Sequence, residues 1–271
     1  MGRRKILNFL LNPLGFQVYK HTNKKFYHDV LKITRDYKKG LVQQIGESLN
    51  YTIASGPFEG LLLPKYGAWS DLDIASKLIG AYEQEIFPAI EDIIHRYPKF
   101  IVNISASEGY YAIGLKRRLP ATLCYTYDID ERTFSILAEC MESNHVEVSR
   151  LKIFDYQSPL IDIDETRHDF GCFIVDCEGF ETEIIKFPRS TSQSSIFLIE
   201  LHESIKPGVT KLLMDFFSET HDVEIFSQTD HSLGGYPQLQ KYDLFQRSII
   251  LDEQRGVPMQ WLYAVPLEAS K

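Results

Sequence analysis

From residue 99 onward, short apolar runs alternate with helical stretches, and this alternation limits the possible folds more than any other feature of the sequence. The runs are rich in β-branched residues, as expected of strands that are covered on both faces. Between them, apolar residues recur at helical spacing. Strand–helix alternation of this regularity predicts parallel strands joined by crossover helices. The expected strands cover 100–104, 122–127, 151–154, 172–175, 196–201, 221–227 and 261–265, and the expected helices cover 109–119, 132–143, 210–218, 238–251 and a segment from about residue 180.

The preceding 98 residues lack this alternation. Residues 1–56 indicate two or three short helices, and Ser70 is expected to cap a helix that begins near Asp71. Apolar residues at helical spacing predict a further helix over 82–97. We therefore expect an N-terminal helical extension over 1–98 and an α/β domain over 99–271. The last two expected strands fit a seven-stranded, mostly parallel sheet with one antiparallel edge strand.

Composition and charge exclude some classes of function. The chain has 271 residues, 44% of them apolar and 24% charged, which is typical of a globular protein. Its net charge of −8 argues against nucleic acid as a partner. Residues 1–40 differ, because they carry ten Lys or Arg against two Asp, while the remainder carries −16. We interpret these cations as the solvated face of an amphipathic segment, and contact with a membrane surface or an acidic partner is the alternative.

The cysteines and the first residues bear on the compartment. The four cysteines form no C-x-x-C pair, so we expect reduced thiols and neither a zinc site nor a disulfide framework. The start, MGRRKILNFLLNP, is interrupted by Asn and Pro and is followed by no small-residue cleavage site, so we expect no signal peptide. These features predict a cytoplasmic protein.

The turn after the first expected strand is the first candidate ligand site. Residues 100–111 read FIVNISASEGYY, so a buried strand leads directly into small residues, an acid and a glycine. This pattern differs from the G-x-G-x-x-G turn that binds dinucleotides, because Asn103, Ser105 and Gly109 occupy the places of D-x-G-x-x-x-G. Glu108 would repel a pyrophosphate but not a ligand that carries an ammonium and a sulfonium, although it could simply offset the helix dipole. The turn therefore favours S-adenosylmethionine over a nicotinamide dinucleotide.

Acids also follow the second and third expected strands. Asp128 ends the second strand about twenty residues after Gly109, where this type of fold places an acid that binds the ribose hydroxyls. Asp130 is expected to cap the following helix instead. Asp155, just past the third strand, either accepts from the adenine amino group or forms a simple Asx turn.

Acids and an imidazole follow the fourth and fifth expected strands. Glu200 and His202 alternate with Leu201, so their side chains point the same way, and Asp176 ends the adjacent strand. His202, oriented by a carboxylate, could act as a general base. Alternatively, Asp176, Glu200 and His202 could bind a divalent cation such as Mg²⁺. A third interpretation is structural, with Asp176 and Glu178 capping a helix, but an unpartnered carboxylate at the end of a central strand is costly to bury.

Several segments together resemble a known family. The segments VNISASEGYYAIGL, YDID, FIVDCEGFE and FLIELHE are similar to the FkbM-type branch of class I S-adenosylmethionine-dependent methyltransferases. The closing LDEQRGVPMQW is similar to a bacterial subgroup of that branch. The resemblance covers residues 57–265 and, more loosely, the first 20. It implies a Rossmann-like methyltransferase that acts on the oxygen of a sugar or a related secondary metabolite.

The resemblance also implies roles for individual residues. The turn would line the methionine end of the cofactor, Asp128 would bind the ribose, and a small-molecule or glycan acceptor would face the acids after the fourth and fifth strands. The family usually has Asp or Asn at 103 and Gly at 105, so Ser105 adds a side chain where the cofactor passes closest. A catalytically weak or inactive binding protein of the same fold is therefore the alternative. The expected cofactor contacts are Asn103, Ser105, Ala106, Ser107, Glu108, Gly109, Tyr110, Asp128, Ile129, Asp155 and Tyr156, and the expected catalytic residues are Asp176, Glu178, Glu200 and His202.

Three residues near the C-terminus match the subgroup ending without an evident role. They are Glu253, Arg255 and Trp261. We expect Trp261 to pack in the core, and the sequence assigns no chemistry to the other two.

Overall fold

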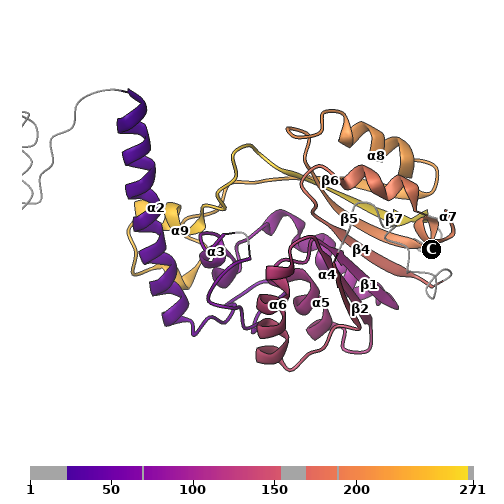
Figure 1. Cartoon of the computed structure of the whole chain (residues 1–271), viewed down its shortest axis with the longest axis horizontal. Coiled ribbons are helices and arrows are strands. Elements are labelled where there is room, and N and C mark those ends of the chain that lie inside the picture. Colours follow the sequence, from indigo (N-terminus) through magenta and orange to yellow (C-terminus); the bar gives the residue numbers. More distant parts are fainter. Residues whose placement is uncertain (1–22, 69, 154–168, 188, 268–271) are drawn as a thin grey trace, which may run out of the picture.

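A seven-stranded sheet forms the centre of the computed structural model, which describes residues 23–68, 70–153, 169–187 and 189–267 (Figure 1). The strand order is β3-β2-β1-β4-β5-β7-β6, and β7 is antiparallel to both of its neighbours while the other pairings are parallel. The strands are β1 (Phe100–Ile104), β2 (Leu123–Asp128), β3 (Arg150–Ile153), β4 (Gly171–Val175), β5 (Ser195–Leu201), β6 (His221–Ser227) and β7 (Gln260–Pro266). The predicted seven-stranded, mostly parallel sheet is confirmed, and its antiparallel strand lies between β5 and the outermost strand β6.

Helices cover both faces of the sheet, which explains why every residue of β1, β4 and β5 is buried (Figure 1). Ile101 belongs to the core under α5, whereas its neighbour Val102 belongs to the opposite core under α8. The α-helices are α2 (Asn23–Ser48), α3 (Ile74–Ile79), α4 (Phe87–Arg96), α5 (Tyr110–Arg118), α6 (Glu131–Asn144), α7 (Arg189–Gln193), α8 (Val209–Phe217) and α9 (Leu244–Leu251), and the 3₁₀ helices are η2 (Gln84–Ile86), η4 (Glu181–Lys186) and η5 (Pro237–Leu239).

The chain reverses its direction across the sheet between β1 and β4. It adds β2 and β3 on one side of β1, and then returns to add β4 and β5 on the other side. Ligands of open α/β sheets bind outside the carboxyl ends of the strands at such a switch point. This arrangement agrees with the predicted Rossmann-like α/β fold, and it directs attention to the segments that follow β1, β4 and β5.

The N-terminal part differs from the expectation. One 26-residue helix, α2, replaces part of the several short helices predicted over 1–56, and residues 1–22 lie outside the described part of the chain. Its C-terminal half packs on α3 and α9, and buried Lys38 binds Asp252 with an Nζ–Oδ2 distance of 3.1 Å. The prediction of a cap at Ser70 was wrong, because α3 begins after Asp73.

Two predicted helices in the C-terminal half are interrupted. The helix expected over 238–251 is divided into η5 and α9, because Asp243 begins a new helix through a capping box with Gln246. The segment after residue 180 forms the 3₁₀ helix η4 and the five-residue helix α7. In the described part of the chain, no helix is both long and apolar enough to cross a membrane.

The boundary predicted at residue 98 remains a prediction. The described part of the extension does not stand apart from the sheet, since Ile45 and Leu78 share one hydrophobic core with Ile101 and Leu198. This packing brings side chains of α3 to the carboxyl edge of the sheet.

Candidate active site

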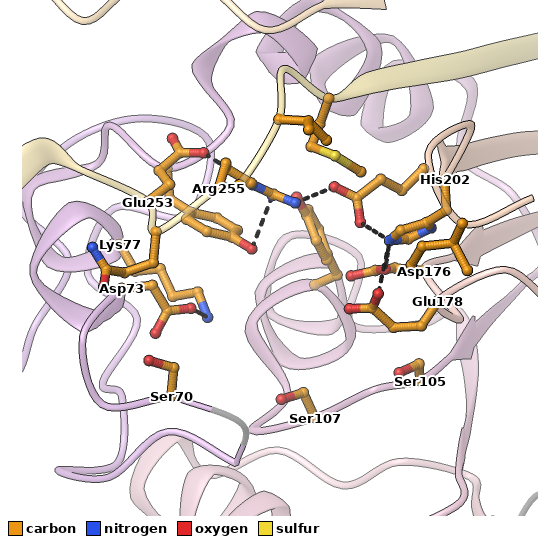
Figure 2. Close-up of a pocket in the computed structure, with 18 of the residues that line it drawn as sticks. Ser70, Asp73, Lys77, Ser105, Ser107, Asp176, Glu178, His202, Glu253 and Arg255 are labelled. Carbon is orange, nitrogen blue, oxygen red and sulfur yellow. Dashed lines mark hydrogen bonds and ion pairs between the residues drawn. The ribbon is translucent and has the colours of Figure 1, made fainter. Parts of the chain in front are cut away.

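A cleft of about 530 Å³ opens at the carboxyl ends of β1, β4 and β5, within the size range of small-molecule sites. Its walls come from α3, from the turn between β1 and α5, from the ends of β4 and β5, and from the loop before β7. Figure 2 shows Asp73 and Lys77 at one end, the cluster around His202 at the other, and Arg255 between them. Six carboxylates line the cleft, from Asp73, Glu108, Asp176, Glu178, Glu200 and Glu253.

The turn between β1 and α5 has an unusual backbone. Ser105 and Ser107 have φ values of 63° and 50°, in the left-handed region that favours glycine. Gly109 follows with φ 93°, and a Cβ there would lie 2.5 Å from Leu137 Cδ1. The backbone amides of Ser105 and Ala106 donate to Tyr127 O at 2.8 and 3.1 Å, which ties the turn to the end of β2. The sequence therefore places serine where the backbone takes a glycine conformation.

If the ligand is S-adenosylmethionine, as the sequence predicts, replacing Ser105 by glycine is expected to tighten its binding several-fold. Glycine would remove a side chain from the cleft wall. The free energy of unfolding should change by no more than about 1 kcal/mol, because relief of the left-handed backbone strain in the folded protein offsets the greater entropy of the unfolded chain. Calorimetry would measure the affinity for the ligand, and urea unfolding would measure the free energy of unfolding. Asn50→Gly is a matched control, since Asn50 also has a positive φ, 49°, but does not line the cleft. Weaker binding in S105G would instead show that the serine hydroxyl contacts the ligand.

The carboxylate of Asp128 binds the backbone of the turn between β1 and α5. Its Oδ2 accepts from Ser107 N and its Oδ1 from Asp130 N, each at 3.0 Å, and the residue is only 2% exposed. Burial raises the pKa of Asp128, although the backbone amides act in the opposite direction. Asp130 caps α6 by accepting from Arg132 N at 2.9 Å, as predicted.

The structure brings together only part of the predicted cofactor site. Ser105, Ala106, Ser107 and Glu108 line the cleft. Tyr110 is buried against Tyr82 and Phe58 instead. Five predicted contacts do not line the cleft, namely Asn103, Gly109, Tyr110, Asp128 and Ile129, while Asp155 and Tyr156 lie outside the described residues.

Glu108 already has a cationic partner, which the sequence did not predict. Its carboxylate forms a buried ion pair with Lys77, and Lys77 Nζ also lies 2.7 Å from Asp73 Oδ2. Burial alone would raise the pKa of Glu108, but the Lys77 ammonium outweighs it and holds the pKa below its usual range. The negative charge of Glu108, which the sequence suggested would distinguish between nucleotides, is therefore offset by Lys77. Asp73 and Glu108 together carry one more negative charge than Lys77 balances. Asp73 Oδ1 is buried without a hydrogen-bond partner in the described structure.

An acid–imidazole cluster closes the other end of the cleft. His202 Nε2 faces Glu178 Oε2 and Glu200 Oε2 at 3.3 Å and Asp176 Oδ1 at 3.7 Å. Its Nδ1 lies 2.7 Å from Oε1 of Glu181, which is fully buried. Burial would lower the pKa of His202, but the surrounding carboxylates outweigh it and raise the pKa to about 10. The four predicted catalytic residues thus meet at one point.

Strand geometry explains how the cluster forms. Glu200 and His202 lie on the same side of β5, and the pairing of Val175 with Ile199 places Asp176 beside Glu200. Burial raises the pKa of Glu200 well above its usual value, and the neighbouring Asp176 adds to this effect. The prediction that these side chains converge is confirmed.

Arg255, in the loop before β7, forms ion pairs with two buried glutamates. Its guanidinium binds buried Glu200 and buried Glu83, and its Nη2 lies 3.3 Å from Tyr82 Oη. Burial raises the pKa of Glu83 to about 8 despite the nearby guanidinium. Glu253 Oε1 accepts from Glu83 N at 2.9 Å. These residues thus form one connected polar network.

Sequence reasoning missed several residues of the cleft. The closing segment gave a signal for Glu253 and Arg255, but not for their contacts. Nothing in the sequence singled out Asp73 or Lys77, which precede the alternating region. Trp261 is fully buried against Tyr111, which agrees with the expected packing role.

No family model and no curated protein matches the sequence, so the resemblance to the FkbM-type branch stays a prediction. Solved structures show a similar chain path. A precorrin-6y C5,15-methyltransferase from Geobacter metallireducens is 9% identical, with 65% of this chain and 86% of that chain covered and a TM-score of 0.43. A putative O-methyltransferase from Klebsiella pneumoniae is 13% identical, with 68% and 80% covered and a TM-score of 0.41. The O-methyltransferase TomG from Streptomyces achromogenes is 13% identical, with 98% and 99% covered and a TM-score of 0.40.

Proposed function

We propose that this protein is an S-adenosylmethionine-dependent methyltransferase that methylates a hydroxyl group of a small-molecule or glycan acceptor. The observation that carries the proposal is the position and charge of the cleft. It lies at the switch point of the sheet, beside the turn after β1, and six carboxylates line it against Lys77, Arg255 and His202. A cleft of this charge favours a cationic nucleoside over a dinucleotide.

The residues present fit the proposed cofactor. In our proposal, the ammonium of its methionine part lies near Asp73, whose buried Oδ1 lacks a hydrogen-bond partner in the described structure. The turn from Ser105 to Glu108 lies along the same part. Asp128 is 2% exposed and does not line the cleft, but it remains our candidate for the ribose, because each of its oxygens accepts one backbone N–H and keeps a further lone pair.

The acceptor is proposed to lie at the opposite end of the cleft, against Asp176, Glu178 and His202. When bound, S-adenosylmethionine supplies a methyl carbon that leaves sulfur as the acceptor oxygen bonds to it, and the C–S electron pair returns to sulfur. The chain contributes alignment of the acceptor, which supplies most of the barrier reduction in such a displacement. The surrounding carboxylates raise the pKa of His202 to about 10, so the imidazole already holds a proton, and the exposed carboxylate of Glu178 receives the proton of the hydroxyl.

One observation favours a second candidate function, a binding protein of this fold with little or no activity. Ser105 presents a side chain to the cleft where the family that the sequence resembles usually has glycine. Such a protein would bind the nucleoside weakly or not at all.

Calorimetric titration of the full chain with S-adenosylmethionine and S-adenosylhomocysteine tests the proposed function. We expect both ligands to bind with submillimolar dissociation constants. Matched titrations with NADH should give no heat, because the carboxylates would repel its pyrophosphate. Absence of heat with both adenosyl ligands up to 1 mM would contradict a methyltransferase role and favour the binding-protein alternative.

A further inference from the structure

We propose that Asp176, Glu178 and His202 bind a divalent cation in the cleft, with Glu200 Oε2 at the edge of its coordination sphere. Among the described residues, these three side chains can each offer one ligand atom, with all of the atoms within 4.8 Å of one another. This geometry alone supports the binding of a cation. Only the role of the cation in methyl transfer rests on the proposed function.

The hydrogen-bonding capacity of the imidazole is too small for its surroundings. Three carboxylate oxygens, from Asp176, Glu178 and Glu200, lie 3.3–3.7 Å from the single Nε2 atom of His202. One N–H can satisfy one acceptor well, so the others lack a donor from this ring. Asp176 Oδ1 in particular is buried and has no hydrogen-bond partner in the described structure. A cation at the common centre would satisfy all of these atoms at once.

The spacing of the donor atoms suits a metal ion. Adjacent ligands of an octahedral ion are separated by √2 times the bond length, which is about 2.8–3.0 Å for Mg²⁺ and about 3.3–3.7 Å for bonds of 2.3–2.6 Å. The carboxylate oxygens lie 3.3–3.7 Å from His202 Nε2. These distances match the bonds of about 2.3–2.6 Å of Ca²⁺ as they stand, and small inward movements would fit a smaller ion. Oxygen donors with one imidazole favour a first-row ion such as Mn²⁺ over Ca²⁺.

The surroundings of the imidazole resemble the outer shell of metal-binding histidines. Nδ1 lies 2.7 Å from Glu181 Oε1, and the same oxygen accepts from Gly179 N at 2.9 Å. When Nδ1–H donates to this buried carboxylate, the Nε2 lone pair is directed at the three oxygens. The predicted ligand set of Asp176, Glu200 and His202 thus changes, because one oxygen of Glu200 is bound by Arg255 while Glu178 lies on the open side.

A cation here would be placed to act on the acceptor. Glu178 is two-thirds exposed at the mouth of the cluster, so a ligand in the cleft can reach the proposed ion. A divalent ion would lower the pKa of a coordinated hydroxyl and could hold two neighbouring oxygens of a sugar diol. If the proposed function holds, the preferred acceptors are therefore vicinal diols.

Electron paramagnetic resonance of Mn²⁺ added to chelator-treated, full-length protein tests this inference. We expect one bound equivalent, and we expect pulsed spectra to show coupling to an imidazole nitrogen. Glu178→Gln should weaken Mn²⁺ binding by at least about tenfold, since even outer-shell partners of metal sites contribute that much. Glu183→Gln removes the same charge from an exposed pair with Lys186 nearby and should leave binding unchanged.

Several outcomes would overturn the inference. They are binding of less than one equivalent, the absence of nitrogen coupling, or equal affinities in E178Q and E183Q. The outcome is separate from that of the proposed function, because nucleoside binding is measured on the same protein by calorimetry. Adenosyl ligand binding without Mn²⁺ binding would remove the cation and keep the methyltransferase, while Mn²⁺ binding without adenosyl ligand binding would do the reverse.

Discussion

Replacing His202 by glutamine is expected to reduce methyl transfer by about a hundredfold or more, while the affinity for S-adenosylmethionine stays within a few-fold of the wild-type value. His202 contacts the four carboxylates at the acceptor end of the cleft. The turn that we propose to hold the cofactor forms a different wall. Loss of the imidazole should therefore act on the acceptor and on its proton, not on nucleoside binding.

The assay for H202Q follows radiolabelled methyl from S-adenosylmethionine into a small-molecule and glycan extract, with calorimetry for cofactor affinity and thermal unfolding to confirm the fold. His95→Gln is the control, because His95 lies exposed on α4, away from the cleft. Transfer by H202Q at the wild-type rate would contradict the role of the cluster. Loss of folding would show that His202 is structural, and E178Q would then test the cluster, since Glu178 is largely exposed.

Replacing Arg255 by methionine is expected to lower the free energy of unfolding by about 3–5 kcal/mol. Glu83 and Glu200 are each 1% exposed, and the guanidinium binds both. The variant would leave two buried carboxylates without this cation, although the methionine would replace part of the lost packing. Urea unfolding measures the effect, and Lys211→Met is the control, because the pair of Lys211 with Asp215 is exposed.

Two further results separate this explanation from a simple packing defect. Adding Glu83→Gln and Glu200→Gln to R255M should restore part of the lost stability, because the buried charges are then removed. The deficit of R255M should also grow as the pH rises above about 8. Burial raises the pKa of Glu83 to about 8 in the wild-type protein, and loss of the guanidinium would raise it further, so above pH 8 the folded variant keeps a proton that the folded wild type releases. A stability within 1 kcal/mol of wild type at every pH would contradict the account of Arg255.

The sheet and the acid–imidazole cluster could be predicted because their signals are local. Runs such as FIVNI and SIFLIEL are apolar throughout, and their residues are all buried in the structure. Alternation along β5 was enough to place Glu200 and His202 on one side, and parallel pairing brought Asp176 to them. These predictions needed only the period of a strand and the common edge of a parallel sheet.

The remaining parts of the site depend on contacts between distant segments. Lys77 meets Glu108 across 31 residues, and Arg255 meets Glu83 across 172 residues. Neither pair follows a helical or strand period, so the sequence shows these charged residues but does not indicate which of them form ion pairs. The prediction of several short helices in the N-terminal part was wrong for a related reason. Leu41 and Ile45 are buried against the rest of the core, and this packing stabilises the single long helix α2.

A crystal structure of the complex with S-adenosylhomocysteine would show whether the cleft holds the cofactor. We expect the amino-acid part of the ligand against the turn from Ser105 to Glu108, the ribose near Asp128, and the sulfur directed along the cleft toward His202. A ligand bound away from this turn, or a cleft that stays free of the ligand at millimolar concentration, would contradict this expectation.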